Sequence, residues 1–99
     1  MHSPDPFPEG SQFSAFCSAQ SGALPLHFQW LKNERIISSD SHIQIVSLDE
    51  MQSNLKIKKV NASDSGNYTC TVRNSHGIDS QTVKLIVKGK KASYFLLQR

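Results

Sequence analysis

The sequence contains no long apolar run. None of its segments approaches the roughly 18 apolar residues that a membrane-spanning helix needs, and the first residues lack the basic and apolar regions of a signal peptide. The segment 89–99 is basic at both ends and apolar between them, and it is also too short to span a bilayer. We expect it to be a linker or tail with poor order.

The sequence also lacks the residue patterns of an active site. It has no glycine-rich phosphate loop and no paired acid and base. Asp40, Ser41 and His42 are consecutive, and they cannot form a catalytic relay because neighbouring strand side chains point to opposite faces. The four histidines fall in different segments, so they do not form a zinc-ligand set. We predict a protein that is not an enzyme and uses no metal or cofactor.

Positive charge is present but not concentrated. Eleven Lys and Arg against eight Asp and Glu give a net charge of +3, spread along the chain. Nucleic-acid binding depends on counterion release, which needs a concentrated basic patch. We therefore predict no nucleic-acid partner.

With 99 residues, of which 37% are hydrophobic, the chain has room for one domain.

Short segments of alternating apolar and polar residues, separated by turn residues, fill most of the chain. They predict about seven strands, in the ranges 11–19, 26–32, 35–37, 41–47, 54–59, 67–74 and 80–88. We expect a polar connection at residues 48–53 and a hairpin turn at residues 74–77, with a positive φ at Gly77. Strands of this number and spacing are typical of a β-sandwich or a small barrel.

The two cysteines fall on strands that are predicted to face one core. Cys17 shares the inward face of its segment with Phe13 and Ala15, and Cys70 shares that of its segment with Tyr68. A disulfide between them would contribute about 4 kcal/mol in the chain-entropy model. The alternative is a pair of buried free thiols.

Other inward positions complete the predicted core. Trp30 can pack its indole on the disulfide, and Leu55 faces inward from a later strand. The buried hydroxyl of Tyr68 needs a partner, which the backbone of the turn at Asp64 and Gly66 would supply as a tyrosine corner. The last strand is predicted to face inward at Val83, Leu85 and Val87.

These motifs together resemble the immunoglobulin superfamily of the intermediate type, the I-set, over about residues 8–88. The resemblance rests on Glu9, Gly10, Cys17, Trp30, Leu55, Ile57, Val60, residues 64–70, Asn74, Gly77, Val83, Leu85 and Val87. It implies an all-β sandwich of two sheets, called ABED and GFC, joined by an inter-sheet disulfide. The short interval between Trp30 and Leu55 predicts no C″ hairpin.

Two features depart from the family pattern. Residues 1–7 leave room only for a short N-terminal segment with a partial strand A. His42 stands where the family often carries Arg or Lys facing the turn aspartate, which is Asp64 here. Two arrangements are open at this position: His42 faces Asp64, or it is a solvated histidine at the end of its strand.

Residues 21–33 and 65–77 look most like the Dscam (Down syndrome cell adhesion molecule) family, including its arthropod relatives. The resemblance implies the ectodomain of a neuronal or immune cell-surface receptor, with an identical copy on an opposing cell as its partner. A heterophilic receptor or ligand-binding module is one alternative. An intracellular structural I-set domain is another.

The ABED sheet is predicted to carry the self-binding surface. Phe16, flanked by serines on an outward face, has the profile of an interface anchor, although a single exposed phenylalanine is also ordinary. Acidic residues at 49–50 and the lysines of the next strand would meet in an antiparallel two-fold dimer. The predicted interface consists of Ser14, Phe16, Ser18, Gln44, Val46, Lys56 and Lys58. On the competing GFC sheet, the apolar candidates are Leu31 and Ile86.

Two asparagines lie in Asn-x-Ser/Thr motifs, at Asn61 and Asn67. Both are candidates for N-glycosylation. Because such motifs also arise by accident, they support an extracellular location only together with the predicted disulfide.

Overall fold

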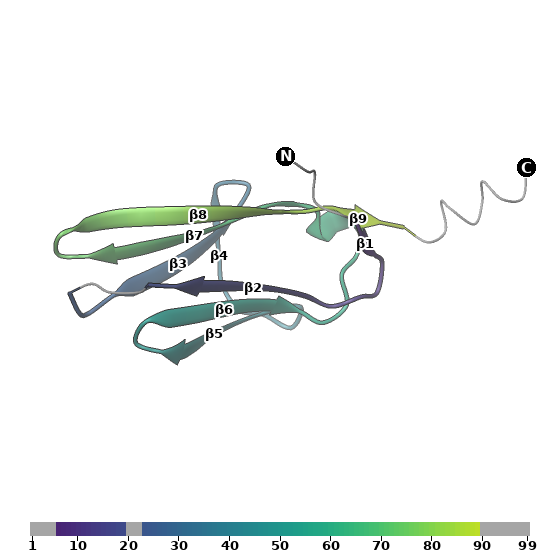
Figure 1. The fold of residues 1–99 in the computed structure, drawn as a ribbon. Coiled ribbons are helices and arrows are strands. Elements are labelled where there is room, and N and C mark those ends of the chain that lie inside the picture. Colours follow the sequence, from purple (N-terminus) through teal and green to yellow (C-terminus); the bar gives the residue numbers. More distant parts are fainter. Residues whose placement is uncertain (1–5, 20–22, 90–99) are drawn as a thin grey trace, which may run out of the picture.

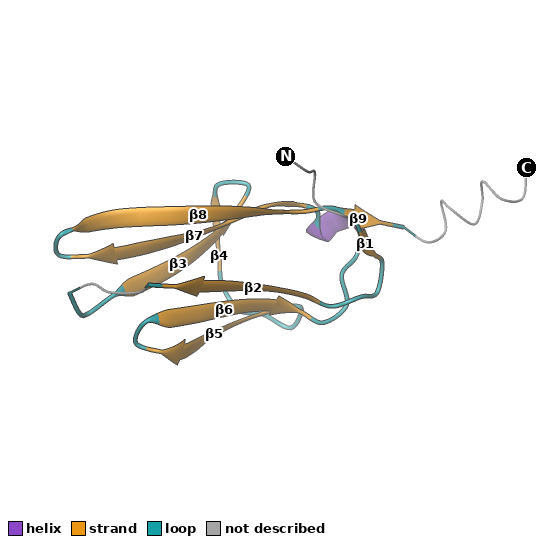
Figure 2. Cartoon of the chain, viewed as in Figure 1, coloured by secondary structure: helices purple, strands orange, loops and turns teal. Residues whose placement is uncertain are grey.

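The computed structural model describes residues 6–19 and 23–89 and shows two antiparallel sheets packed face to face (Figures 1 and 2). One sheet has the order β2 (Phe13–Ser18), β6 (Gln52–Ile57), β5 (Ile43–Asp49). The other has the order β4 (Arg35–Ile37), β3 (His27–Lys32), β7 (Gly66–Asn74), β8 (Gly77–Leu85). A short parallel pair joins β1 (Phe7–Pro8) to β9 (Val87–Lys88), and one turn of 3-10 helix, η1 (Ala62–Asp64), precedes β7. The predicted two-sheet sandwich is confirmed.

The partial strand A was expected within residues 1–7 as part of the ABED sheet, whereas strand β1 covers Phe7–Pro8 and lies outside the β2–β6–β5 sheet. Strand β1 pairs with β9 beside the GFC sheet, and the amide of Phe7 donates to the carbonyl of Ile86 at 2.8 Å. The Phe7 ring packs edge-on against Phe13, with 5.4 Å between the ring centroids. The predicted tail lies outside the described residues beyond Gly89, and so do residues 1–5.

Two predicted connections differ from the structure. Residues 48–53 were expected to form a polar connection, but β5 continues to Asp49 and β6 begins at Gln52, which leaves a turn of two residues. The last hairpin is also tighter than predicted, because β8 begins at Gly77. Gly77 does not adopt a positive φ. The Asn74 side-chain oxygen holds this turn instead, accepting from the amides of His76 and Gly77 at 2.8 and 3.1 Å.

The middle of the sequence follows the prediction of a compact domain without a C″ hairpin. In the described part of the chain, β4 is followed directly by β5. No helix among the described residues is long and apolar enough to cross a membrane.

The core lies between the two sheets. Its buried side chains include Phe13, Ala15, Cys17, Trp30, Leu55, Ile57, Val60, Tyr68, Cys70 and Leu85. Val83 lies on the inward face of its strand as predicted, but its side chain is 42% exposed. Val83 is paired with the buried Tyr68 but lies on β8, the outermost strand of its sheet. No further strand in the described part of the chain covers it there.

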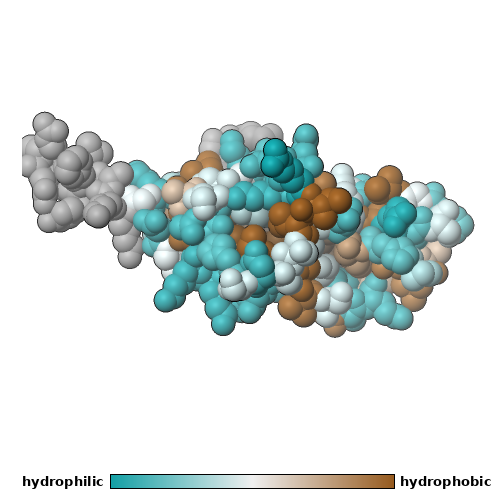
Figure 3. Space-filling view, turned by 180° about the vertical axis from the view of Figure 1, so that it is seen from behind, coloured by the Kyte–Doolittle hydropathy of each residue, from teal (hydrophilic) through white to brown (hydrophobic). Residues whose placement is uncertain are grey.

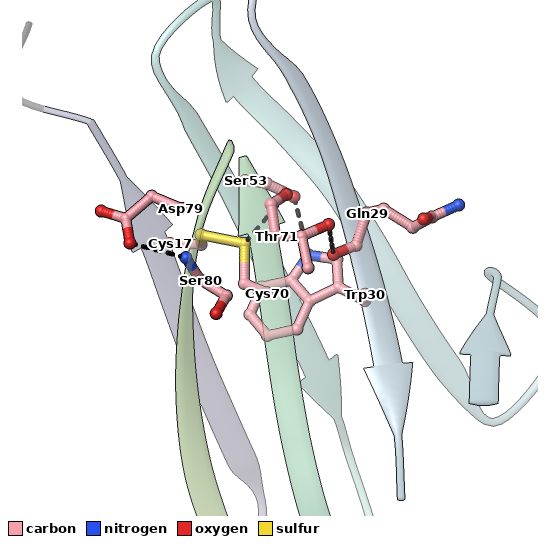
Figure 4. Close-up of a disulfide and its surroundings, with 8 residues drawn as sticks. All are labelled: Cys17, Gln29, Trp30, Ser53, Cys70, Thr71, Asp79 and Ser80. Atoms are coloured by element: carbon pink, nitrogen blue, oxygen red, sulfur yellow. Dashed lines mark hydrogen bonds between the residues drawn. A yellow bond between two sulfur atoms is a disulfide. The ribbon is translucent and has the colours of Figure 1, made fainter. Parts of the chain in front are cut away.

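Cys17 and Cys70 form the predicted disulfide between the two sheets, and the alternative of two free thiols is wrong (Figure 4). The sulfurs are 2.00 Å apart, and the bond lies beside the indole of Trp30. The indole N–H donates to the hydroxyl of Ser53 on β6 at 2.9 Å, while Trp30 itself lies on β3. The two sheets are therefore joined by one covalent bond and by one buried hydrogen bond.

Candidate recognition surface

The turn before β7 is organised around Tyr68. Its hydroxyl is fully buried and donates to the main-chain carbonyl of Asp64 at 2.6 Å, which is the geometry of a tyrosine corner. Gly66 has a φ of +156°, and a Cβ there would lie 2.9 Å from the side-chain amide of Asn33. The oxygen of that amide accepts from the backbone N–H of Asn67 at 3.0 Å. The close approach explains why glycine occupies this position.

The carboxylate of Asp64 links the corner to His42, the residue directly before β5. It is buried, and it accepts from the backbone N–H of Asn61 at 2.8 Å, closing a capping box around η1. The Nε2 atom of His42 lies 2.8 and 3.0 Å from its two oxygens, so His42 does face Asp64. Asp40 instead accepts from the backbone amides of His42 and Ile43, which is a turn contact and not part of a relay.

The tyrosine corner should make the domain sensitive to alkali. Burial, together with the nearby negative charge of Asp64, raises the pKa of Tyr68 to about 12. A phenol in an unfolded chain titrates near 10. The stability that the neutral hydroxyl contributes is therefore fully present below about pH 10 and is lost as the pH rises toward 12. The loss from this group at pH 12 should be roughly 2–3 kcal/mol.

Urea denaturation of the wild type and of Tyr68→Phe between pH 9 and 12 measures this contribution. The variant cannot ionise at this position, so its free energy of unfolding should fall less steeply with pH. Because lysine deprotonation is common to both proteins, the difference between their slopes isolates Tyr68. Parallel slopes would contradict the prediction.

The ABED face is the outward side of β2, β6 and β5. Strand pairing places its side chains in rows, and the middle row consists of Phe16, Asn54 and Val46. Phe16 is 69% exposed and Val46 is 50% exposed. The side-chain oxygen of Asn54, between them, is buried and has no hydrogen-bond partner among the described residues. Two exposed apolar groups thus flank an unsatisfied acceptor.

The rows on either side of this middle row are polar and differ in charge. One row consists of Ser14, Lys56 and Gln44, and the other of Ser18, Gln52 and Asp49. Lys58 is exposed just beyond the end of β6, on the basic side. Strand pairing therefore brings six of the seven predicted interface residues to one face, all except Lys58, with lysine at one end and an acid at the other.

Sequence reasoning missed two residues of this region. Leu48 is exposed in the register irregularity between Ser47 and Asp49, and the prediction omitted it because it ended the strand at residue 47. Its spacing of two from Val46 was the available signal. Asn54 was not among the predicted interface residues, and nothing in the sequence reveals that its oxygen lacks a donor among the described residues.

The GFC face carries different apolar residues from those predicted. Leu31 and Ile86 are only partly exposed, whereas Ile36 and Ile78 are strongly exposed. These two isoleucines lie on the opposite edge strands, β4 and β8. The central rows between them are polar and include Gln29, Thr71 and Ser80. Exposed apolar side chains are therefore separated on this face, while on the ABED face they share one row.

Hydrophobic atoms are also visible at the surface when the molecule is seen from behind (Figure 3). In the view from behind, brown atoms gather over the middle of the body between polar residues (Figure 3).

Neither glycosylation candidate lies on the ABED face, since Asn61 caps η1 and Asn67 lies on β7 of the other sheet. Both asparagines are exposed.

Comparison with known proteins places these features in a family. The model of the family described as the immunoglobulin I-set domain matches residues 7–87. The cell adhesion molecule DSCAML1 of Gallus gallus is 38% identical over 72 residues, which is 73% of this chain and only 4% of that protein. A crystal structure of the Dscam1 Ig7 domain, isoform 5, superposes with a TM-score of 0.82 at 29% identity, covering 87% of this chain and 88% of that one.

A second kind of relative shares the fold. The I-band fragment I67–I69 from titin superposes with a TM-score of 0.78 at 28% identity, covering 86% of this chain and 29% of that one.

The matched family and fold are non-enzymatic, which confirms the prediction that the chain is not an enzyme. Within residues 6–19 and 23–89, no group of three or more His, Cys, Asp or Glu could hold a metal ion.

Proposed function

Because this chain belongs to the immunoglobulin I-set family, we propose that it is an extracellular recognition domain of a cell-adhesion protein and binds a second copy of itself through the ABED face. The observation that carries the proposal is the exposed middle row of that face. Phe16 and Val46 present apolar surface on both sides of the central strand, with serines and glutamines around them. An apolar centre with a polar rim is the usual anatomy of a protein–protein interface.

The charge pattern favours a second copy as the partner. Lys56 lies on one side of the middle row and Asp49 on the other. An antiparallel two-fold arrangement brings each acid toward the basic row of the other copy, and it does so twice. The face is thus complementary to itself.

The disulfide and the glycosylation candidates support an extracellular location. Disulfides persist in oxidising compartments, and Cys17 and Cys70 are paired. A glycan on Asn67 would cover part of the GFC sheet and leave the ABED face free, because the outer faces of the two sheets point in opposite directions. The similarity to titin domains keeps an intracellular structural role as the competing proposal.

Sedimentation at several concentrations and bead aggregation test the proposal. Beads that carry the wild-type chain should cluster, and Phe16→Asp should weaken self-association by about 30-fold or more, the effect of losing an interface anchor. Ile78→Asp is the matched control, because Ile78 is equally exposed, at 69%, but lies on the GFC sheet. This variant should cluster like the wild type.

Two results would reject the ABED proposal. One is a wild-type chain that stays monomeric at all concentrations, which would favour a heterophilic or a structural role. The other is clustering that survives Phe16→Asp and is lost with Ile78→Asp, which would move the site to the GFC face.

A further inference from the structure

We propose that Asn67 carries an N-linked glycan and that the first sugar of this glycan lies in a polar hollow beside it on the GFC face. The proposal shares with the proposed function only the extracellular location. Asn67 lies on β7, and its exposed side chain points away from the core, because the next residue, Tyr68, is buried. A sugar attached to this side chain therefore leaves the packing of the core unchanged.

The backbone of Asn67 is held on both sides. Its N–H donates to the side-chain oxygen of Asn33 at 3.0 Å, and its carbonyl accepts from the N–H of Asn33 at 2.8 Å. On the other side, Asn67 pairs with Lys84 of β8. An attached sugar starts from a fixed point of the sheet, so it meets the same neighbours in every molecule.

The hollow next to this point has the chemistry of a carbohydrate site. Its volume is about 340 Å³, and it is lined by Asn33, Glu34, Asn67, Thr69 and Thr82. Each of these residues carries a hydroxyl, amide or carboxylate group. Small-molecule sites of this size are usually lined by apolar side chains with a few polar groups. A lining of polar side chains instead suits a ligand with many hydroxyl groups, such as a sugar.

The hydroxyl groups of the hollow have bonding capacity to spare. The hydroxyls of Thr69 and Thr82 lie 2.8 Å apart, so one of them donates to the other. Each hydroxyl has one proton and two lone pairs. The pair can therefore also donate one hydrogen bond to a sugar oxygen and accept others from sugar hydroxyls.

The turn between β3 and β4 supplies a carboxylate to the hollow in an unusual backbone conformation. Glu34 has a φ of 70°, in the left-handed region that favours glycine. Residues held in this region are found more often at functional sites. Here the conformation belongs to a lining residue whose carboxylate can accept from sugar hydroxyls or from the acetamide N–H of N-acetylglucosamine.

A glycan in the hollow also lies beside apolar surface of the same sheet. Strand pairing places Thr69 and Thr82 in one row with Leu31 and Ile36, and Ile36 is 67% exposed. The glycan therefore restricts the access of other proteins to this part of the GFC face.

Secretion of the chain from a eukaryotic cell line, with a signal peptide added, tests the modification. Mass spectrometry of its peptides should show a glycan on Asn67 in more than half of the molecules, and Asn67→Gln should abolish that signal. Asn61 is measured in the same experiment for comparison, because it is equally exposed but its side-chain oxygen caps η1. An unoccupied Asn67 would overturn the proposal, whether or not Asn61 is glycosylated.

Nuclear magnetic resonance tests the position of the sugar. After enzymatic trimming to a single N-acetylglucosamine, its protons should show nuclear Overhauser effects to the methyl groups of Thr69 and Thr82. Thr71 is the matched control, because it lies two residues further along β7 on the same face, and its methyl group should show none. Absence of the contacts to Thr69 and Thr82 would show that the hollow does not hold the sugar.

These measurements are independent of the proposed self-association. Occupancy of Asn67 is read by mass, whereas self-association is read by sedimentation. A glycosylated chain that stays monomeric would reject the proposed function and support the present proposal. A chain that self-associates with Asn67 unmodified would do the reverse.

Discussion

Replacing both cysteines, in Cys17→Ala/Cys70→Ala, should lower the free energy of unfolding by about 4 kcal/mol. The disulfide closes a loop with a sequence separation of 53, and in its absence the unfolded chain regains the corresponding conformational freedom. Domains of this size have only about 5–15 kcal/mol to lose. Much of the variant should therefore be unfolded near physiological temperature.

Urea denaturation of the wild type, with and without reductant, and of the double variant measures the effect. The reduced wild type should resemble the double variant, since both lack the covalent link between β2 and β7. A loss below about 1 kcal/mol would show that the packed core holds the sheets together without the bridge. It would also strengthen the case for an intracellular structural domain, which folds without a disulfide.

Asp64→Ala should lower the free energy of unfolding by about 3 kcal/mol. The substitution removes the acceptor for the Asn61 amide and the partner of His42 in one step, and it leaves a part-buried N–H without a bond. Asp64 also supplies the carbonyl that binds the Tyr68 hydroxyl, so loosening of η1 would disturb the tyrosine corner. Thermal or urea denaturation at neutral pH measures the loss.

Two further variants show how much of this loss of stability comes from the carboxylate oxygens and how much from the imidazole of His42. Asp64→Asn retains one acceptor oxygen and should cost less than Asp64→Ala. His42→Ala removes only the partly exposed partner and should cost about 1 kcal/mol or less, as solvent-screened pairs do. If His42→Ala proved as damaging as Asp64→Ala, the imidazole would be the main anchor of the turn, contrary to the capping interpretation.

The core was the most predictable part of the molecule. Alternation along single strands placed Cys17, Trp30 and Tyr68 inward, and all three are buried. This information is local, because each strand turns successive side chains to opposite faces regardless of which strand it pairs with. The exposure of Val83 has the opposite origin. Its direction follows from the strand, but its exposure depends on β8 being an edge strand.

Turns and strand ends were predicted less well. Residues 48–53 are polar enough to suggest a long connection, yet four of the six lie in β5 and β6. Both strands are longer than the local composition predicts, because hydrogen bonds between the backbones of β5 and β6 stabilise the extended conformation of these polar residues. The same extension brought Leu48 into β5, where the prediction had no strand.

The candidate recognition surface shows the limit of sequence reasoning most clearly. The sequence by itself predicted the inward face of each strand and, through its resemblance to the I-set, a two-sheet sandwich with a Cys17–Cys70 bridge, since side-chain alternation and the order of cysteine and tryptophan are properties of the chain. Only the tertiary structure decided that Phe16, Asn54 and Val46 form one row and that the Asn54 oxygen has no donor. Row membership depends on the register between strands distant in sequence, and hydrogen-bond satisfaction depends on every neighbour that packing brings within reach.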